Sequence, residues 1–383
     1  MTLKNSFKTL LLLLLTPIVT SAQWEPIMQD TSVREVFVQD TNIFVGTSDG
    51  RIYLTGDFGQ SWTKLIDGLP GSVMDIGISD SNKLFCSSQR FIYSSNNWFD
   101  WNQVYQISSD VTCMTIDGAN IYVGGGFSAG IHASLDNGIH WSDISGNLVT
   151  PYLTSVAAED TNLMISLYSH SVFHSTNFGT NWNENNQGIL DDIFALHYHL
   201  GFYAGGENRI YKLDDGNWKT LLYTGRQMLD FASNELWTCA VGSSTTKVYC
   251  SEDSGLNWIE VDAPWFIWAI DIYEDYLLAG SSNGLFKYKI QQVSNPIHFT
   301  EDKRLVVFPN PCKDHFIVNC PIDSGGKMEL SIMNLLGKCV FKNSYESTEQ
   351  ICCHGITDLC NGIYIVNIVQ GKHIFNEKLI IKH

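Results

Sequence analysis

The chain is poor in basic residues, poor in proline and, after its first 22 residues, without any long apolar run. Of its 383 residues only 9 are proline, and 23 Lys and Arg stand against 40 Asp and Glu, which gives a formal charge of −17. A membrane-spanning helix needs about 20 consecutive apolar residues, so none is expected beyond the N-terminus. Residues 23–299 carry 31 acidic and 12 basic side chains, a formal charge of −19. Because this charge repels phosphate, nucleic acid is not an expected partner.

The sequence also lacks the spacing of a metal site. Its 10 cysteines suit an oxidising compartment, but no paired short spacing of Cys and His occurs, and His354 alone does not supply one. We therefore expect neither a metal ion nor a cofactor. Cys239 and Cys250 lie nearly symmetrically about a turn at residues 243–246, so they would face each other across a hairpin. The sequence leaves open whether they form a disulfide, because the geometry decides this.

Residues 1–22 have the layout of a secretory signal peptide. Lys4 and Lys8 precede a leucine run at residues 10–15, and small residues at 20–22 come before the expected cleavage point. The run is too short and too early to count as a membrane span. No cysteine follows the expected cleavage point, so a lipoprotein anchor is not indicated. Export from the cytoplasm is the predicted consequence.

Seven tryptophans recur at nearly constant spacing. They are Trp24, Trp62, Trp101, Trp141, Trp182, Trp218 and Trp258, with intervals of 38, 39, 40, 41, 36 and 40 residues. A unit of about 40 residues made of short alternating apolar runs is typical of one blade of a β-propeller. No helical pattern competes with this one, so an all-β fold is predicted.

Four of these tryptophans close the same turn of eight residues. The copies are Thr55, Asp57, Gly59 and Trp62; Ser134, Asp136, Gly138 and Trp141; Ser175, Asn177, Gly179 and Trp182; and Ser251, Asp253, Gly255 and Trp258. Hydroxyl and carboxylate oxygens accept backbone N–H groups in a tight hairpin, and glycine adopts the positive φ that such a turn requires. The pattern resembles the Asp-box of BNR-like β-propellers. Two copies are degraded: before Trp101 the slots hold Ser94, Asn96 and Trp98, and the turn before Trp218 is one residue short.

The order of the strands predicts how the ring closes. Three-strand segments start near residues 33, 72, 110, 151, 191, 227 and 264, but Trp24 has no segment before it and the last segment has no tryptophan after it. The strand from Trp24 is therefore expected to complete the sheet of residues 264–290 and to pair its exposed edge. The prediction is a seven-bladed β-propeller over residues 23–292.

The pattern changes after residue 292. Residues 293–300 are interpreted as a linker, and residues 301–383 contain alternating apolar runs with Gly and Asn turns that predict a small β-sandwich. Its cues in chain order are Pro309, Asn310 and Pro311, then Gly337 and Lys338 of the run NLLGK, then Gly362 and Tyr364 of the run NGIYIV, and finally Lys382. Together they resemble the C-terminal sorting domain of the type IX secretion system of Bacteroidetes. This resemblance implies the type IX machinery as a partner and, after periplasmic transit, a secreted or surface-attached protein; the alternative is an accessory sandwich.

One functional hypothesis is a glycoside hydrolase, because Asp-boxes occur in sialidases and some endoglucanases. A sialidase needs several arginines that converge on a substrate carboxylate, but Arg51 and Arg209 share one repeat slot and are expected apart on the rim. An endoglucanase needs two facing carboxylates, for which Asp191 and Asp262 in loops between sheets are the candidates. Loop aspartates are more often turn caps. No Ser-His-Asp arrangement, phosphate-binding loop or zinc-binding helix motif occurs.

The favoured hypothesis is a non-catalytic binding or scaffolding module. The repeats also resemble those of the photosystem assembly factor of plants and cyanobacteria and of sortilin-type receptors, which bind proteins. The ligand would be an extracellular glycan, peptide or protein. The loop at residues 261–268 leads into the first strand of the last segment, and its Trp265 and Trp268 are the candidate ligand-binding residues. The alternative is that these aromatic side chains pack between sheets.

Overall fold

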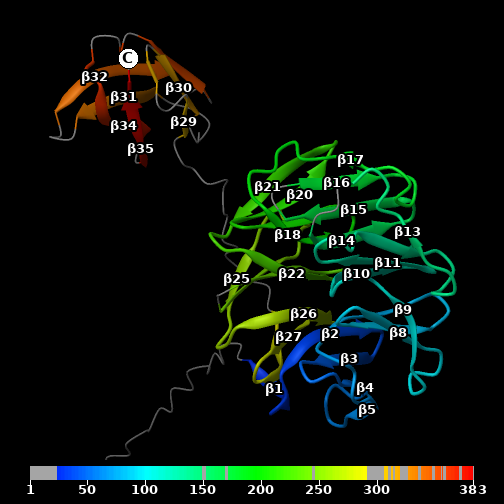
Figure 1. The fold of residues 1–383 in the computed structure, drawn as a ribbon. Coiled ribbons are helices and arrows are strands. Elements are labelled where there is room, and N and C mark those ends of the chain that lie inside the picture. Colours follow the sequence, from blue (N-terminus) through cyan, green and yellow to red (C-terminus); the bar gives the residue numbers. More distant parts are fainter. Residues whose placement is uncertain are drawn as a thin grey trace, which may run out of the picture.

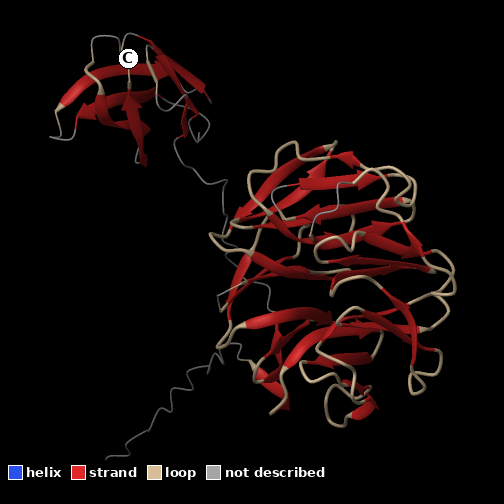
Figure 2. Ribbon diagram, viewed as in Figure 1, coloured by secondary structure: helices blue, strands red, loops and turns tan. Residues whose placement is uncertain are grey.

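The computed structural model describes residues 24–148, 152–168, 171–243 and 246–290, and, in the C-terminal part, 306–308, 312–313, 315–319, 327–334, 338–346, 350–354, 356, 359–370 and 373–382. Every regular element in these ranges is a β-strand (Figure 2). None of the described elements is a helix able to span a membrane. The predicted signal peptide, the linker and Pro309, Asn310, Pro311 and Gly337 lie outside the described residues.

Within the described part of residues 24–290 the strands form seven four-stranded antiparallel sheets (Figure 1). Six sheets follow the chain: β2 (Val33–Gln39), β3 (Asn42–Thr47), β4 (Ile52–Thr55) and β5 (Thr63–Ile66); β6 (Val73–Ile78), β7 (Leu84–Ser88), β8 (Phe91–Ser95) and β9 (Asn102–Gln106); β10 (Val111–Asp117), β11 (Asn120–Gly125), β12 (Ile131–Ser134) and β13 (Ser142–Asp143); β14 (Leu153–Glu159), β15 (Asn162–Leu167), β16 (Ser171–Ser175) and β17 (Asn183–Glu184); β18 (Ile193–Tyr198), β19 (Phe202–Gly206), β20 (Arg209–Asp214) and β21 (Asn217–Tyr223); β22 (Met228–Ser233), β23 (Thr238–Gly242), β24 (Lys247–Ser251) and β25 (Ile259–Asp262). The remaining sheet joins β26 (Ile267–Tyr273), β27 (Tyr276–Ser281) and β28 (Gly284–Lys289) to β1 (Glu25–Gln29).

The first strand of each three-strand segment is the innermost strand of its sheet. These strands contact one another in the order β2, β6, β10, β14, β18, β22 and β26, and β26 contacts β2. The sheets therefore close into a ring, which is the architecture of a β-propeller.

The N-terminal strand completes the last sheet, as the sequence predicts. β1 pairs antiparallel with β28, with Glu25 opposite Lys287 and Pro26 opposite Phe286. The indole Nε1 of Trp24 donates a hydrogen bond of 2.8 Å to the backbone carbonyl of Asp262 in the neighbouring sheet. The edge of β28 is thus covered by a strand that lies at the far end of the sequence, and the closure prediction is confirmed.

Close approach between neighbouring sheets explains the glycines that end several second strands. A Cβ on Gly46 would lie 2.6 Å from the side chain of Val73 in the next sheet, and a Cβ on Gly280 would lie 2.7 Å from Val33 across the closing interface. Both distances are below any normal contact, so a side chain at either position would push the sheets apart.

The repeated turn between the third and fourth strands is built from side-chain oxygens. The Oγ of Ser134 accepts a hydrogen bond of 2.8 Å from the N–H of Gly138 and donates one of 2.9 Å to Asp136. The same carboxylate accepts the N–H of His140 at 2.8 Å, and Trp141 donates its indole N–H to the carbonyl of Gly138 at 3.3 Å. Equivalent serine or threonine bonds to glycine occur in the three other copies, at Thr55 and Gly59, Ser175 and Gly179, and Ser251 and Gly255.

The two degraded turns differ from the sequence interpretation. Before Trp101, Ser95 donates to Asn97, and Asn97 accepts the N–H of Phe99 at 3.0 Å, so the acceptors lie one residue later than the Ser94 and Asn96 slots. Before Trp218, a two-residue hairpin turn with positive φ at Asp215 and Gly216 replaces the motif.

The C-terminal residues form two further sheets. They are β29 (Val306–Phe308), β30 (His315–Asn319) and β33 (Gln350–His354), and, in the spatial order β32-β31-β34-β35, β31 (Lys327–Asn334), β32 (Cys339–Glu346), β34 (Gly362–Gln370) and β35 (His373–Ile381). One apolar cluster contains residues of both sheets, among them Phe316, Leu330 and Val366.

Four of the predicted sorting residues are described there. Lys338 accepts a backbone bond from Asn334 in the turn between β31 and β32, and Gly362 begins β34. Tyr364 donates its hydroxyl to the carbonyl of Cys360 at 2.8 Å, and Lys382 donates its N–H to Cys312.

Removal of residues 23–29 is expected to destabilise the ring strongly, because it deletes β1 and exposes the edge of β28. Loss of one buried tryptophan costs about 3–5 kcal/mol, to which the lost strand hydrogen bonds add. The free energy of unfolding in urea measures this. Trp24→Phe serves as a control that keeps most of the packing and loses only the indole N–H. A truncated chain as stable as the full one would show that β1 does not close the ring.

Candidate ligand site at the channel mouth

A β-bulge at the same place in every innermost strand creates a ring of side chains. The bulges fall between Val33 and Glu35, Val73 and Asp75, Val111 and Cys113, Leu153 and Ser155, Ile193 and Ala195, Met228 and Asp230, and Ile267 and Ala269. A bulge redirects the extra residue. The residues inside these bulges line one central cavity of about 370 Å³: Arg34, Met74, Thr112, Thr154, Phe194, Leu229 and Trp268. We call this set the mouth ring.

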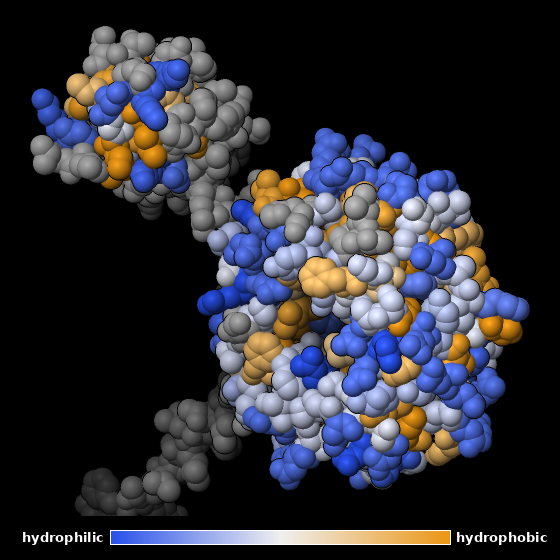
Figure 3. Space-filling model, in the orientation of Figure 1, coloured by the Kyte–Doolittle hydropathy of each residue, from blue (hydrophilic) through white to orange (hydrophobic). Residues whose placement is uncertain are grey.

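The mouth ring is mostly apolar and holds one cation. The guanidinium of Arg34 lies 4.4 Å from the centre of the Trp268 ring, and Phe266 meets the same indole edge-on at 6.2 Å. Figure 3 shows a hollow near the middle of the ring of sheets, bordered by hydrophobic and strongly hydrophilic residues. Trp268, one of the two predicted ligand residues, is thus part of the cavity wall.

Aromatic side chains extend the mouth ring outward into a groove. A cavity of about 300 Å³ is lined by Phe127, Tyr152, Thr154, Tyr168 and Phe194. Thr154 and Phe194 also belong to the mouth ring. Phe127 is 75% exposed and Tyr168 58% exposed, although both are large and apolar in their rings. Tyr152 lies between them, with ring centres 5.2 Å from Phe127 and 6.4 Å from Tyr168. Exposed aromatic rings that line a cavity mark a binding surface. We call these four aromatic residues, Phe127, Tyr152, Tyr168 and Phe194, the aromatic groove.

A second cavity joins the groove to the mouth ring. It has a volume of about 500 Å³ and contains Tyr152, Thr154 and Phe194 together with Met74 and Leu229 of the mouth ring. Asp110 and Gln89 also line this cavity. The two surfaces therefore form one continuous depression on a single face.

Carboxyl groups lie one position deeper in the channel. Asp75 accepts a hydrogen bond of 2.9 Å from the Ser87 hydroxyl and also accepts the backbone N–H of Met114 in the next sheet. Asp230 accepts the N–H of Ile270 in the next sheet at 2.9 Å. Glu35 in the same position accepts the N–H of Ile76. These side chains satisfy backbone donors on the unpaired edges of neighbouring innermost strands.

Two further side chains do the same with small variations. Ser155 accepts the N–H of Leu196 at 2.9 Å through its hydroxyl, and Asp271, two positions farther along β26, accepts the N–H of Val38 at 2.6 Å. The inner edges are therefore joined from sheet to sheet by polar side chains around most of the ring.

Burial changes the acidity of these groups. It raises the pKa of Asp75 to about 6 and the pKa values of Asp230 and Asp271 to about 7. The pKa of Glu35 is raised well above its usual range, first by burial and then by the neighbouring carboxylates. Their side chains are half-buried by surface area because the channel reaches them. Within the described residues no three metal-ligating side chains converge on a metal-sized site.

Trp265 lies away from the mouth ring. Its indole stacks on Phe286 with ring centres 4.0 Å apart, and it packs against the apolar cluster between the last two sheets. The structure thus separates the two tryptophans that the sequence grouped together: Trp268 lines the channel, and Trp265 packs.

Asp191 and Asp262 are both engaged in ion pairs. Asp191 is 5% exposed, lies 2.6 Å from the Arg209 guanidinium and accepts the Tyr211 hydroxyl at 3.0 Å. Asp262 is exposed and lies 2.6 Å from the Lys247 ammonium. They belong to different sheets, and the described contacts do not join them. Each of these two carboxylates is thus held by a cation of its own sheet, whereas a glycosidase uses an acid and a base that face each other across the substrate.

The rim cations are paired within their own sheets. Arg51 binds Asp67 at 3.0 Å and also binds Asp49, just as Arg209 binds Asp191. Arginines held in this way do not converge on one substrate carboxylate. The Arg209 and Asp191 side chains are 23% and 5% exposed, so this pair is more buried than the pair of Arg51 and Asp67.

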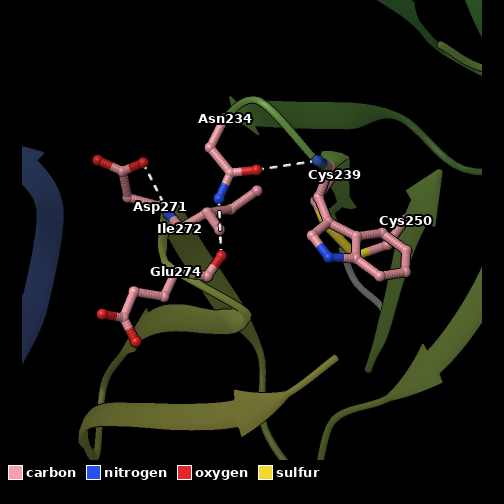
Figure 4. Close-up of a disulfide and its surroundings, with 7 residues drawn as sticks. Asn234, Cys239, Cys250, Asp271, Ile272 and Glu274 are labelled. Atoms are coloured by element: carbon pink, nitrogen blue, oxygen red, sulfur yellow. Dashed lines mark hydrogen bonds between the residues drawn. A yellow bond between two sulfur atoms is a disulfide. The ribbon is translucent and has the colours of Figure 1, made fainter. Parts of the chain in front are cut away.

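A disulfide links two strands of the sheet that precedes the one completed by β1. Cys239 on β23 lies directly opposite Cys250 on β24, with Cα atoms 4.1 Å apart, and their sulfur atoms are bonded (Figure 4). Nearby, the Asn234 amide donates to the Glu274 carbonyl at 2.7 Å and accepts the Trp237 N–H at 2.9 Å. Asn234 therefore ties this sheet to the following one.

The C-terminal part of the chain matches a known family. Residues 306–382 match the secretion system C-terminal sorting domain. Such a domain indicates interaction with the type IX secretion machinery and export to the cell surface or beyond. No curated protein matches the chain.

Solved structures share the β-propeller fold at low identity. YCF48 bound to D1 peptide is 11% identical, with a TM-score of 0.57 over 72% of this chain and 96% of that chain. PorZ of Porphyromonas gingivalis, an essential bacterial surface component of the type IX secretion system, is 13% identical, with a TM-score of 0.52 over 92% of this chain and 60% of that one. The extracellular domain of BT4673 from B. thetaiotaomicron is 10% identical, with a TM-score of 0.57 over 95% of this chain and 58% of that one.

The buried carboxyls are expected to make the chain less stable as the pH rises. Because their pKa values are higher in the folded than in the unfolded chain, the stability they contribute is complete below about pH 4 and is lost as the pH passes through the folded values. The free energy of unfolding should therefore fall between about pH 5 and pH 8.

Asp75→Asn combined with Asp230→Asn should flatten this slope in urea unfolding at several pH values. Asp136→Asn is the matched control, because hydrogen bonds from His140 lower the pKa of that exposed carboxyl to about 2. An unchanged slope in the double variant would show that the channel carboxyls are not responsible.

Proposed function

We propose that the chain is an exported binding protein in which a seven-bladed Asp-box propeller presents the mouth ring and the aromatic groove to an extracellular ligand. The signal peptide at residues 1–22 and a C-terminal β-sandwich that ends the chain would supply passage through the periplasm and recognition by the type IX machinery. The family match at residues 306–382 supports the route. The contiguous aromatic depression supports the binding role.

The aromatic groove carries this proposal. Phe127 and Tyr168 expose most of their rings to solvent while they line a cavity. Burial of two such rings by a ligand would contribute several kcal/mol, whereas their exposure in the free protein is unfavourable. The peptide bound to YCF48, a protein of similar fold, supports a polypeptide or similarly extended ligand. Glycans, which stack their apolar ring faces on aromatic side chains, are the other ligand class.

Catalysis receives no support from the same surface. The carboxyls of the channel accept backbone N–H groups, and Asp191 is neutralised by Arg209. A hydrolase would need an acid and a base free to exchange protons with substrate. We therefore place the glycoside hydrolase hypothesis second.

Phe127→Ala with Tyr168→Ala should weaken binding on a peptide and glycan array by about 2 kcal/mol, or roughly 30-fold in Kd. Leu256→Ala is the control, because Leu256 is 78% exposed and lies on a turn away from the groove. The binding role would be contradicted if the protein hydrolyses a polysaccharide and Asp262→Asn abolishes this activity.

Residues 301–383 should be needed for export and dispensable for propeller folding. In a host with a type IX system, residues 1–295 should give a folded protein, because the propeller has apolar clusters of its own. This protein should stay in the periplasm, because it lacks the residues that match the sorting domain. Fractionation followed by immunoblotting measures its location. Recovery of this truncated chain from the medium or the outer surface would rule out the sorting role.

A further inference from the structure

The channel below the mouth ring is lined by carboxyl groups. Glu35, Asp75 and Asp230 line its cavity, and among the lining residues Arg34 is the only Lys or Arg. The guanidinium of Arg34 lies against Trp268 at the level of the mouth ring. A ligand group that passes the mouth ring therefore meets three carboxyls.

These carboxyls have acceptor positions that the protein does not use. Asp75 receives one hydroxyl and one backbone N–H, and Asp230 receives the N–H groups of Ile270 and Phe231. An ionised carboxylate offers about four acceptor positions, so about half of them remain for a donor in the cavity. A neutral sugar hydroxyl would bring hydrogen bonds but no charge, and the buried negative charge would stay uncompensated. An ammonium or guanidinium group supplies both.

The aromatic groove and the channel are close enough for one extended ligand to enter both. Tyr152, Thr154 and Phe194 line both the groove and the cavity that leads to the mouth ring. An extended polypeptide rises about 3.3 Å per residue and its alternate side chains share a face, so side chains two residues apart, about 7 Å from each other, can occupy the two places. The acidic propeller also attracts a basic ligand over a distance.

We propose, on the basis of the proposed function, that the ligand is a polypeptide segment whose Lys or Arg side chain enters the channel toward Asp75 and Asp230 while an aromatic side chain two residues away packs in the aromatic groove. The mouth ring surrounds the aliphatic stem of the basic side chain. Trp268 and Phe194 contribute apolar contacts at this level.

Binding of this kind depends on pH. A cation binds the ionised carboxylates, so affinity rises as the pH passes upward through about 6 and 7, the pKa values of Asp75 and Asp230, and protons are released on binding. The histidine and the thiol of the channel do not change charge over this range. Burial lowers the pKa of His197 to about 4 and raises that of Cys113 to about 12. The pKa values of Glu35 and Asp271 are raised as well, so these two carboxyls add to the pH dependence.

The test uses residues 23–383 and the blocked peptide Tyr-Gly-Lys-Gly-Tyr, its analogue with norleucine in place of Lys, and cellohexaose. Isothermal titration in two buffers of different ionisation enthalpy gives affinity and proton release together. The Lys peptide should bind at least tenfold more tightly than the norleucine peptide at pH 8, and this advantage should shrink at pH 5. Asp75→Asn with Asp230→Asn should remove the advantage, and Asp136→Asn should leave it unchanged.

The outcomes separate this inference from the proposed function. The cationic ligand would be overturned if both peptides bind equally, or if cellohexaose binds more tightly than either. The binding role would remain intact if Phe127→Ala with Tyr168→Ala abolishes that binding. Lys-dependent binding that survives the Asp75 and Asp230 changes would also overturn the cationic ligand. If Phe127→Ala with Tyr168→Ala changes neither these affinities nor the array profile, the binding role of this face fails as well.

Discussion

Each innermost strand of the ring has one edge that no strand covers, and the N–H groups on that edge need acceptors. Side chains of the adjacent sheet provide them: Asp230 bonds to Ile270, and Asp271 bonds to Val38 across the closing interface. An unpaired buried N–H costs about 1–3 kcal/mol, so such bonds hold the sheets together and fix their spacing. The acceptors are carboxyls in several sheets, and the same arrangement therefore places acidic groups in the channel.

The bulges act together with these bonds. They add one residue to the start of every innermost strand, and this residue lines the channel instead of packing between sheets. A bulge that recurs in all seven sheets of the described ring thus yields a ring of seven side chains of six different kinds. The repeats are alike in backbone and unlike in the chemistry that they present at the mouth, which suits a scaffold that carries a specific site.

Much of the fold follows from local sequence, and little of the site does. Trp24 and the Gly-centred turns predict the strand order and the closure, because a 40-residue period and an unpaired edge constrain them. The aromatic groove escaped prediction because Phe127, Tyr152 and Tyr168 come from loops and strand ends of two sheets and share no sequence pattern. The placement of Trp265 could not be decided from the sequence for a related reason: a loop aromatic side chain faces either solvent or a neighbouring sheet, and Phe286, on which Trp265 stacks, lies 21 residues farther along the chain. A signal for the channel was present in Glu35, Asp75 and Asp230, which occupy one repeat slot where a core residue is expected.

The role of the channel carboxyls is tested most directly by a crystal structure of residues 23–383 with the Tyr-Gly-Lys-Gly-Tyr peptide at pH 8. The predicted result is a lysine ammonium within about 2.7–3.2 Å of a carboxylate oxygen of Asp75 or Asp230, with a tyrosine ring against Phe127 or Tyr168. A peptide that binds elsewhere, or one that binds in the groove with its lysine in solvent, would contradict it.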